Sequence, residues 1–107
     1  MQGFADLFTL PPDWDSYGAM PIEPSLINRA IAFVNGILTA TSPAPRVVPL
    51  SDGGIQLEWR RMGIDLEVVF DRNEAYFYHR NRANGEEGEG ALPDERASLR
   101  TLLKSLE

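Results

Sequence analysis

The sequence predicts an α+β fold, in which a three- to four-stranded antiparallel meander carries two helices packed on one face in a two-layer arrangement. Two patterns support this prediction. Apolar residues recur at helical spacing in residues 25–40 and 93–106, whereas apolar and polar residues alternate along residues 46–80. The chain has 107 residues, of which 43% are hydrophobic and 24% are charged, so we expect a single packed domain over residues 1–107.

The first part of the chain is expected to form an irregular lead-in followed by a helix. Residues 1–24 contain several prolines, which interrupt regular structure, and enough aromatic residues to lie across the core. Pro24 and Ser25 suit the first turn of a helix over residues 25–40. The apolar stripe of this helix comprises Ile27, Ile31, Val34 and Leu38, and it is widened by Ala30, Phe33 and Ile37.

The next strands predict a hairpin with a defined register. Ile55–Arg61 and Ile64–Phe70 both alternate between apolar and polar residues, and Met62-Gly63 fits between them as a two-residue turn. Pairing about this turn puts the apolar pairs on one face of the sheet. On the other face it sets Glu58 directly opposite Glu67, which is unfavourable unless a neighbouring group compensates the repulsion.

A second turn extends this polar face. Asp71–Glu74 returns the chain into a strand at Ala75–Arg80, which sets Tyr78 opposite Glu67 and Arg80 opposite Asp65. The polar face is therefore expected to gather six candidate binding residues, namely Glu58, Glu67, Tyr76, Tyr78, Arg60 and Arg80.

Three interpretations of this polar face stay open. It could be a polar and aromatic surface that recognises another protein. Alternatively, Glu58, Glu67 and Tyr78 could form an acid–base or divalent-cation site, because neighbouring carboxylates can take up different protonation states. In the third interpretation the face is merely solvated, and its arginines neutralise its acids.

Three elements remain, namely a short strand that precedes the hairpin and a loop and a helix that follow the last predicted strand. Arg46–Leu50 is expected to be an edge strand. It contains a proline, which has no N–H to donate to a neighbouring strand and is therefore found mainly at the edges of sheets. Residues 81–91 are rich in glycine and glutamate, which predicts an acidic loop with little to bury. The final helix, over residues 93–106, has an apolar stripe of Leu99, Leu102, Leu103 and Leu106.

The composition disfavours several classes of site. The chain has no cysteine, which excludes disulfides and thiolate metal sites, and its single histidine, His79, excludes a multi-histidine site within one chain. The formal net charge of −6 repels phosphate backbones and disfavours direct nucleic-acid binding. We expect no catalytic residue, no metal and no cofactor.

The sequence also lacks targeting and membrane signals. Residues 1–10 contain neither the basic residues nor the apolar run of a signal peptide. No segment approaches the roughly 20 apolar residues that a membrane-spanning helix needs. We therefore expect a cytoplasmic location and no membrane contact.

Two unusual strings carry a resemblance. The first is the segment WDSYGA-P, which begins at Trp14, and the second is the hairpin pattern DGG-QLEW…G-DLE, which begins at Asp52. Together they resemble a group of small uncharacterised bacterial proteins, and the resemblance covers residues 11–70. The resemblance implies one compact fold and a bacterial or phage origin for the protein. It implies no activity and no catalytic residue for this chain. Within the first string, Trp14, Asp15 and Tyr17 could form a binding lip or a plug that covers the core edge.

These observations favour a small acidic, non-enzymatic protein-interaction module that binds another protein. A bacterial accessory protein, an antitoxin-like protein or a phage-encoded modulator would be a suitable setting. The first alternative is a small ligand-binding domain or enzyme that uses Glu58, Glu67 and Tyr78. The second is a homo-oligomeric structural module, such as a homodimer that pairs through an edge strand.

Overall fold

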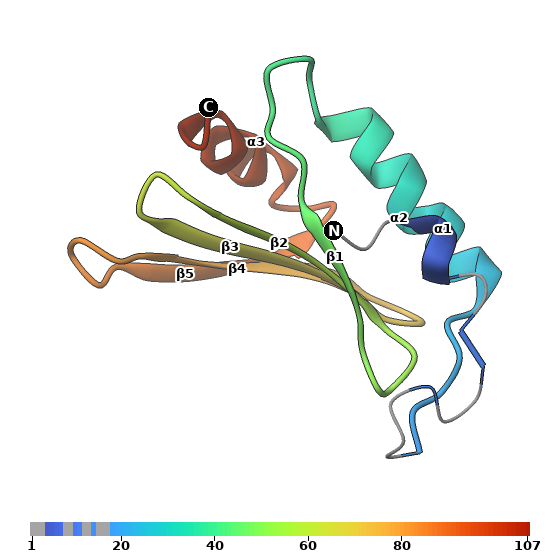
Figure 1. The fold of residues 1–107 in the computed structure, drawn as a ribbon. Helices are drawn as coiled ribbons and strands as arrows, with labels where there is room; N and C mark the ends of the chain where they lie inside the picture. The colour runs from blue at the N-terminus through green and yellow to red at the C-terminus, as the bar shows by residue number, and fades with distance from the viewer. Residues whose placement is uncertain (1–3, 8–9, 12–13, 15–17) are drawn as a thin grey trace.

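The computed structural model describes residues 4–7, 10–11, 14 and 18–107. Within these residues the chain forms three helices and five strands, in the order shown in Figure 1. The helices are α1 (Phe4–Leu7), α2 (Pro24–Ile37) and α3 (Arg96–Ser105). The strands are β1 (Arg46–Pro49), β2 (Ile55–Arg61), β3 (Ile64–Phe70), β4 (Ala75–Asn81) and β5 (Glu87–Leu92).

The strands form one antiparallel sheet in which neighbours along the chain are neighbours in space, in the order β1-β2-β3-β4-β5. The α+β class is confirmed, but the predicted three to four strands are too few, because the sheet has five. The predicted pairings of Glu58 with Glu67 and of Glu67 with Tyr78 are both present. The turn between β2 and β3 has φ of 55° at Met62 and 75° at Gly63. Positive φ at both residues is characteristic of a type I′ turn, whose twist matches that of the two flanking strands.

The additional strand is β5, and the prediction of an acidic loop over residues 81–91 is wrong in its second half. Glu87–Leu92 pairs along β4, so that Gly88 lies opposite His79 and Gly90 opposite Phe77. A Cβ atom built on Gly88 would lie 2.5 Å from His79 Nε2, and one built on Gly90 would lie 2.8 Å from Phe77 Cε1. Gly90 is therefore required by close packing on the inner face, whereas a Cβ atom at Gly88 would meet only the ring of His79, which can turn aside.

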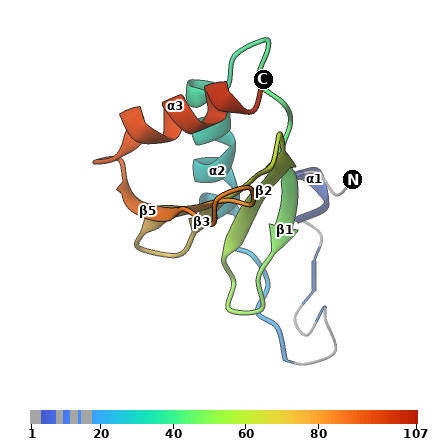
Figure 2. The same ribbon diagram turned by 90° about the vertical axis from the view of Figure 1, so that its left-hand side faces the viewer.

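The core lies between one face of the sheet and the helices. Figures 1 and 2 show α2 and α3 on the same side of the sheet, and neither helix covers the opposite side. The inward residues of the strands are buried together with residues of all three helices. The largest fully buried side chains are Leu7, Ile27, Ile55, Leu57, Leu66, Leu99, Leu106 and Val68.

Helix α2 begins at Pro24, near the predicted start, but ends at Ile37 rather than at residue 40. Leu38 already has an extended backbone, and the Ser42 hydroxyl accepts a hydrogen bond from the Thr39 N–H at 2.9 Å, so a turn forms before the prolines are reached. The buried face agrees with most of the predicted stripe. Of the predicted residues, Ile27, Ala30 and Ile37 are buried, and Ile31, Phe33, Val34 and Leu38 are half-buried against the core. Leu26, which the prediction left out, is also buried.

Helix α3 is shorter than the predicted 93–106. Residues 93–95 form a turn, in which the Glu95 N–H donates to the Ala91 carbonyl at 2.9 Å and the Arg96 N–H donates to the Pro93 carbonyl at 3.0 Å. The helix therefore begins at Arg96. Its leucine stripe packs as predicted, with Leu99, Leu103 and Leu106 buried and Leu102 half-buried against the core.

Candidate functional site

The side of the sheet away from α2 and α3 is called the open face here. Residues that alternate with the buried ones in each strand form it, and the cross-strand register brings them onto one surface. The open face consists of Arg46, Val48, Gln56, Glu58, Arg60, Asp65, Glu67, Val69, Tyr76, Tyr78, Arg80, Glu87, Glu89 and Ala91. All six residues predicted from the sequence lie on it.

At the centre of the open face, Glu58 and Glu67 lie directly opposite each other. Hydrogen-bonded and non-hydrogen-bonded pairs alternate along an antiparallel ladder, starting from the bonded pair next to the two-residue turn. Counting from that pair, Arg61 with Ile64, places Glu58 and Glu67 in a non-hydrogen-bonded pair. In such a pair the Cα atoms are only about 4.5 Å apart and the side chains are closest.

Two groups partly compensate this pair of like charges. The Arg60 guanidinium lies 3.9 Å from Glu58 Oε1 and 3.9 Å from Glu67 Oε1, and the Gln56 side-chain amide donates to Glu58 Oε1 at 2.7 Å. The side chain of Glu58 is 14% exposed and that of Glu67 is 33% exposed. The ion pairs are long, so this half-shielded carboxylate pair keeps the capacity to accept a further cationic group.

Tyr78 and Arg80 connect the centre of the open face to β5. The Arg80 guanidinium lies 3.9 Å from Glu87 Oε1. Burial raises the pKa of the Tyr78 phenol above its ordinary value, and a hydrogen bond to Glu87 and the negative charge of Glu87 add to the rise, whereas Arg80 opposes it. The direction of this shift favours the neutral phenol, which is the form that can donate a hydrogen bond to Glu87.

Tyr76 borders a shallow hollow at the β4–β5 side of the open face. The hollow has a volume of about 230 Å³ and is lined by Glu74, Tyr76, Glu89, Gly90 and Ala91. Tyr76 is 40% exposed, so its ring forms an accessible wall. Two carboxylates beside an aromatic ring are a favourable environment for an ammonium or guanidinium group.

Sequence reasoning missed part of the open face. Glu87 and Glu89 alternate with glycines rather than with apolar residues, a pattern that predicts a loop, so their place on the face follows only from the pairing of β5 with β4. Asp65, which the predicted register sets opposite Arg80, lies on the face with its carboxylate 3.5 Å from Arg82 Nε. Arg46, opposite Glu58, could have been found by extending the same parity to β1.

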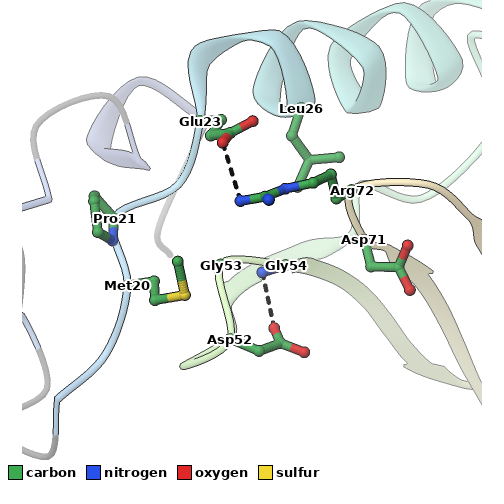
Figure 3. Close-up of a pocket in the computed structure, with 9 residues that line it drawn as sticks. All are labelled: Met20, Pro21, Glu23, Leu26, Asp52, Gly53, Gly54, Asp71 and Arg72. Carbon is green, nitrogen blue, oxygen red and sulfur yellow. Dashed lines mark hydrogen bonds and ion pairs between the residues drawn. The ribbon is translucent and has the colours of Figure 1, made fainter.

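A smaller cavity lies where the lead-in meets α2, the β1–β2 turn and the β3–β4 turn (Figure 3). Its volume is about 130 Å³. Its polar side chains are engaged locally, because Asp52 Oδ1 accepts the Gly54 N–H at 2.9 Å and Arg72 pairs with Glu23 at 3.2 Å. The cavity therefore marks the place where the lead-in packs against the sheet, and its polar side chains already have partners.

Two further residues considered in the sequence analysis, Trp14 and His79, make contacts that hold the fold together. The Trp14 indole donates to the Met20 carbonyl at 2.8 Å and is half-buried, while Asp15 and Tyr17 lie outside the described residues. His79 lies opposite Leu66 and stacks on Phe77 with a centroid separation of 6.3 Å. Among the described residues, no group of three or more acidic or histidine side chains is arranged to hold a metal ion.

No family model, no curated protein and no solved structure matches this chain. The resemblance to small bacterial proteins therefore stays a prediction, and the function has to be argued from the open face itself. In the part of the chain that the structure describes, no helix has the length and apolar character to cross a membrane.

Proposed function

We propose that this chain is a small acidic protein-interaction module that binds a basic region of another protein through its open face. The observation that carries the proposal is the Glu58–Glu67 pair. A directly opposed pair of carboxylates destabilises a sheet unless it is compensated. Here the compensation consists of one arginine at 3.9 Å from each carboxylate and a hydrogen bond from Gln56.

The surroundings of this pair suit recognition of a protein. A lysine or arginine from a partner would complete the charge balance and would bind groups that are already half-shielded from water. Tyr76 and Tyr78 add amphipathic aromatic surface of the kind that is enriched at interfaces. The arrangement is rigid, because each side chain stands on a strand that is paired on both sides within β2, β3 and β4.

The test is a binding measurement with a matched control. The partner is captured from a lysate of the source cell with the full chain, identified by mass spectrometry, purified and titrated by calorimetry. Glu58→Gln with Glu67→Gln removes both central carboxylates. Glu23→Gln with Asp94→Asn makes the same change in net charge on exposed residues outside the open face.

The expected result is a Kd raised about tenfold or more by the central variant and changed less than about twofold by the control variant. The central variant should stay folded and be as stable as the parent or more stable by about 0.2–1 kcal/mol, because a repulsion is removed. Equal effects of the two variants on the Kd would refute a specific role for the open face. A chain that sediments as a stable oligomer with its open face covered would support the homo-oligomeric alternative instead.

A further inference from the structure

The outer edge of β5 carries unpaired backbone groups. The Asn81 N–H donates to the Glu86 carbonyl at 2.8 Å, so the alternation along the β4–β5 ladder makes Gly88, Gly90 and Leu92 the residues that bond to β4. The N–H and C=O groups of Glu87 and Glu89 therefore point away from β4. The Ala91 N–H does so too, whereas its carbonyl accepts the Glu95 N–H at 2.9 Å.

The β3–β4 ladder confirms this alternation independently. The Asp71 N–H donates to the Glu74 carbonyl at 2.9 Å and the Arg82 N–H to the Gly63 carbonyl at 2.8 Å, which makes Tyr76, Tyr78 and Arg80 the residues of β4 that bond to β3. The remaining residues of β4 face β5, as required. We call the outward N–H and C=O groups of Glu87 and Glu89, with the Ala91 N–H, the β5 edge; all three residues are exposed.

The opposite edge of the sheet is closed to a further strand. Strand β1 has only four residues, and the same alternation, counted from the Leu50 N–H bond to the Gly54 carbonyl at 2.9 Å, turns Val47 and Pro49 outward. Proline has no N–H to donate. A strand added to this sheet therefore has complete bonding partners only at the β5 edge.

The chemistry beside the β5 edge indicates which strand would bind there. The side chains of Glu87 and Glu89 stand on the open face at the edge itself, and the hollow lined by Glu74, Tyr76 and Glu89 opens next to it. A strand that pairs here with lysine or arginine on the same face would set its cations against these carboxylates and the Tyr76 ring. A second copy of β5 would instead set glutamates against glutamates.

We propose that the β5 edge takes up an extended, basic segment of a partner protein as a sixth strand of the sheet, with its lysine or arginine side chains on the open face. This inference rests on the proposed function, because it assigns a binding mode and a partner chemistry to the margin of the same face. Backbone hydrogen bonds would supply affinity, and the alternating cations would supply specificity.

The test uses the full chain and a synthetic peptide that alternates threonine with lysine. Hydrogen exchange and amide chemical shifts are followed by NMR. The first control peptide carries glutamate in place of lysine, and the second is methylated on its lysine backbone nitrogens, which removes the donors but keeps the charge. On the protein side, Ala91→Pro removes one edge donor without changing the charge, and Ala91→Thr keeps that donor.

The proposal predicts new exchange protection at the amides of Glu87, Glu89 and Ala91 on addition of the lysine peptide. It also predicts affinity lowered about tenfold or more by peptide methylation and by Ala91→Pro, and little changed by Ala91→Thr. The methylated peptide tests the parent chain, so the result does not depend on the folding of the proline variant.

Three results would overturn this inference. Equal binding of the methylated peptide would mean that charge alone attracts it, and shifts centred on Glu58 and Glu67 would place it elsewhere on the open face. Protection of the edge amides that grows with protein concentration alone would identify a second copy as the occupant. Each of these leaves the proposed function to be decided separately, by the effect of the Glu58 and Glu67 variant on the captured partner.

Discussion

Replacing Gly90 with alanine is the most informative perturbation of the sheet, because it tests whether β5 lies where the structure has it. A Cβ atom at this position would lie 2.8 Å from Phe77 Cε1 and 2.8 Å from both Cβ and Cγ of Glu95. Phe77 is 3% exposed and belongs to the core, and the Cβ of Glu95 is fixed by the turn that leads into α3. Neither neighbour can move without disturbing its own packing.

The magnitude follows from two opposing terms. Alanine gains about 0.5–1 kcal/mol over glycine in a strand, since less backbone entropy is lost on folding. Overpacking in a well-packed site costs about 1–3 kcal/mol. The three contacts at 2.8 Å place the overpacking cost in the upper part of this range, at about 2–3 kcal/mol. We therefore expect Gly90→Ala to lower the free energy of unfolding by about 1–2.5 kcal/mol, which corresponds to a decrease in Tm of roughly 4–8 °C for each kcal/mol.

Gly88→Ala is the matched comparison on the same strand. Its Cβ would meet only the ring of His79, at 2.5 Å from Nε2, and that half-buried side chain can turn aside. The change in stability should therefore stay within about 0.5 kcal/mol. Urea denaturation of both variants, followed by circular dichroism, makes the comparison. A Gly90→Ala variant as stable as the parent would show that β5 does not pack beneath Phe77 and Glu95, and the reasoning would fail.

Three further predictions concern the rest of the fold. Leu66→Ala should lower the free energy of unfolding by about 2–5 kcal/mol in the same assay, because Leu66 is fully buried, and an unchanged midpoint would contradict the β3 assignment. Met62→Asn should raise it by up to about 1 kcal/mol, since Met62 has φ of 55° and asparagine tolerates this conformation better; a loss would argue against the turn. The raised pKa of Tyr78 favours the neutral phenol in the folded state. The contribution of Tyr78 to folding stability is therefore complete below the ordinary tyrosine pKa near 10, and it is lost as the pH rises through the pKa of Tyr78 in the folded state. Ultraviolet titration should find a late-titrating tyrosine that is absent in Tyr78→Phe. Retention of the same late step in Tyr78→Phe would contradict this.

The register of the hairpins could be predicted because period-2 alternation leaves little freedom. In β2 and β3, a slip by one residue would turn Trp59 and Leu66 outward, so the apolar pattern and the two-residue turn specify one pairing. That pairing alone places Glu58 against Glu67. The centre of the candidate site was therefore accessible without a structure.

Strand β5 could not be predicted in the same way, because two of its three inward positions are glycines and only Leu92 carries an apolar side chain. Gly88 and Gly90 leave room for His79 and Phe77, so the core at this place is filled from β4, and the β5 sequence alone resembles a mobile loop. Shortening residues 85–90, which a loop would tolerate, is expected to remove part of this strand and with it the edge beside Tyr76. The bounds of α2 and α3 were missed for a related reason, because local hydrogen bonds from the Thr39 and Glu95 amides form turns inside the apolar pattern.

The most direct test of the central claim is a map of the bound partner on the surface of this chain. Amide and side-chain NMR shifts are recorded with and without the purified partner, at low and at high salt. The account predicts that the affected residues cluster on the open face around Glu58, Glu67 and Tyr78 and that the affinity falls with added salt. Shifts confined to the outer surfaces of α2 and α3, with the open face unchanged, would contradict it.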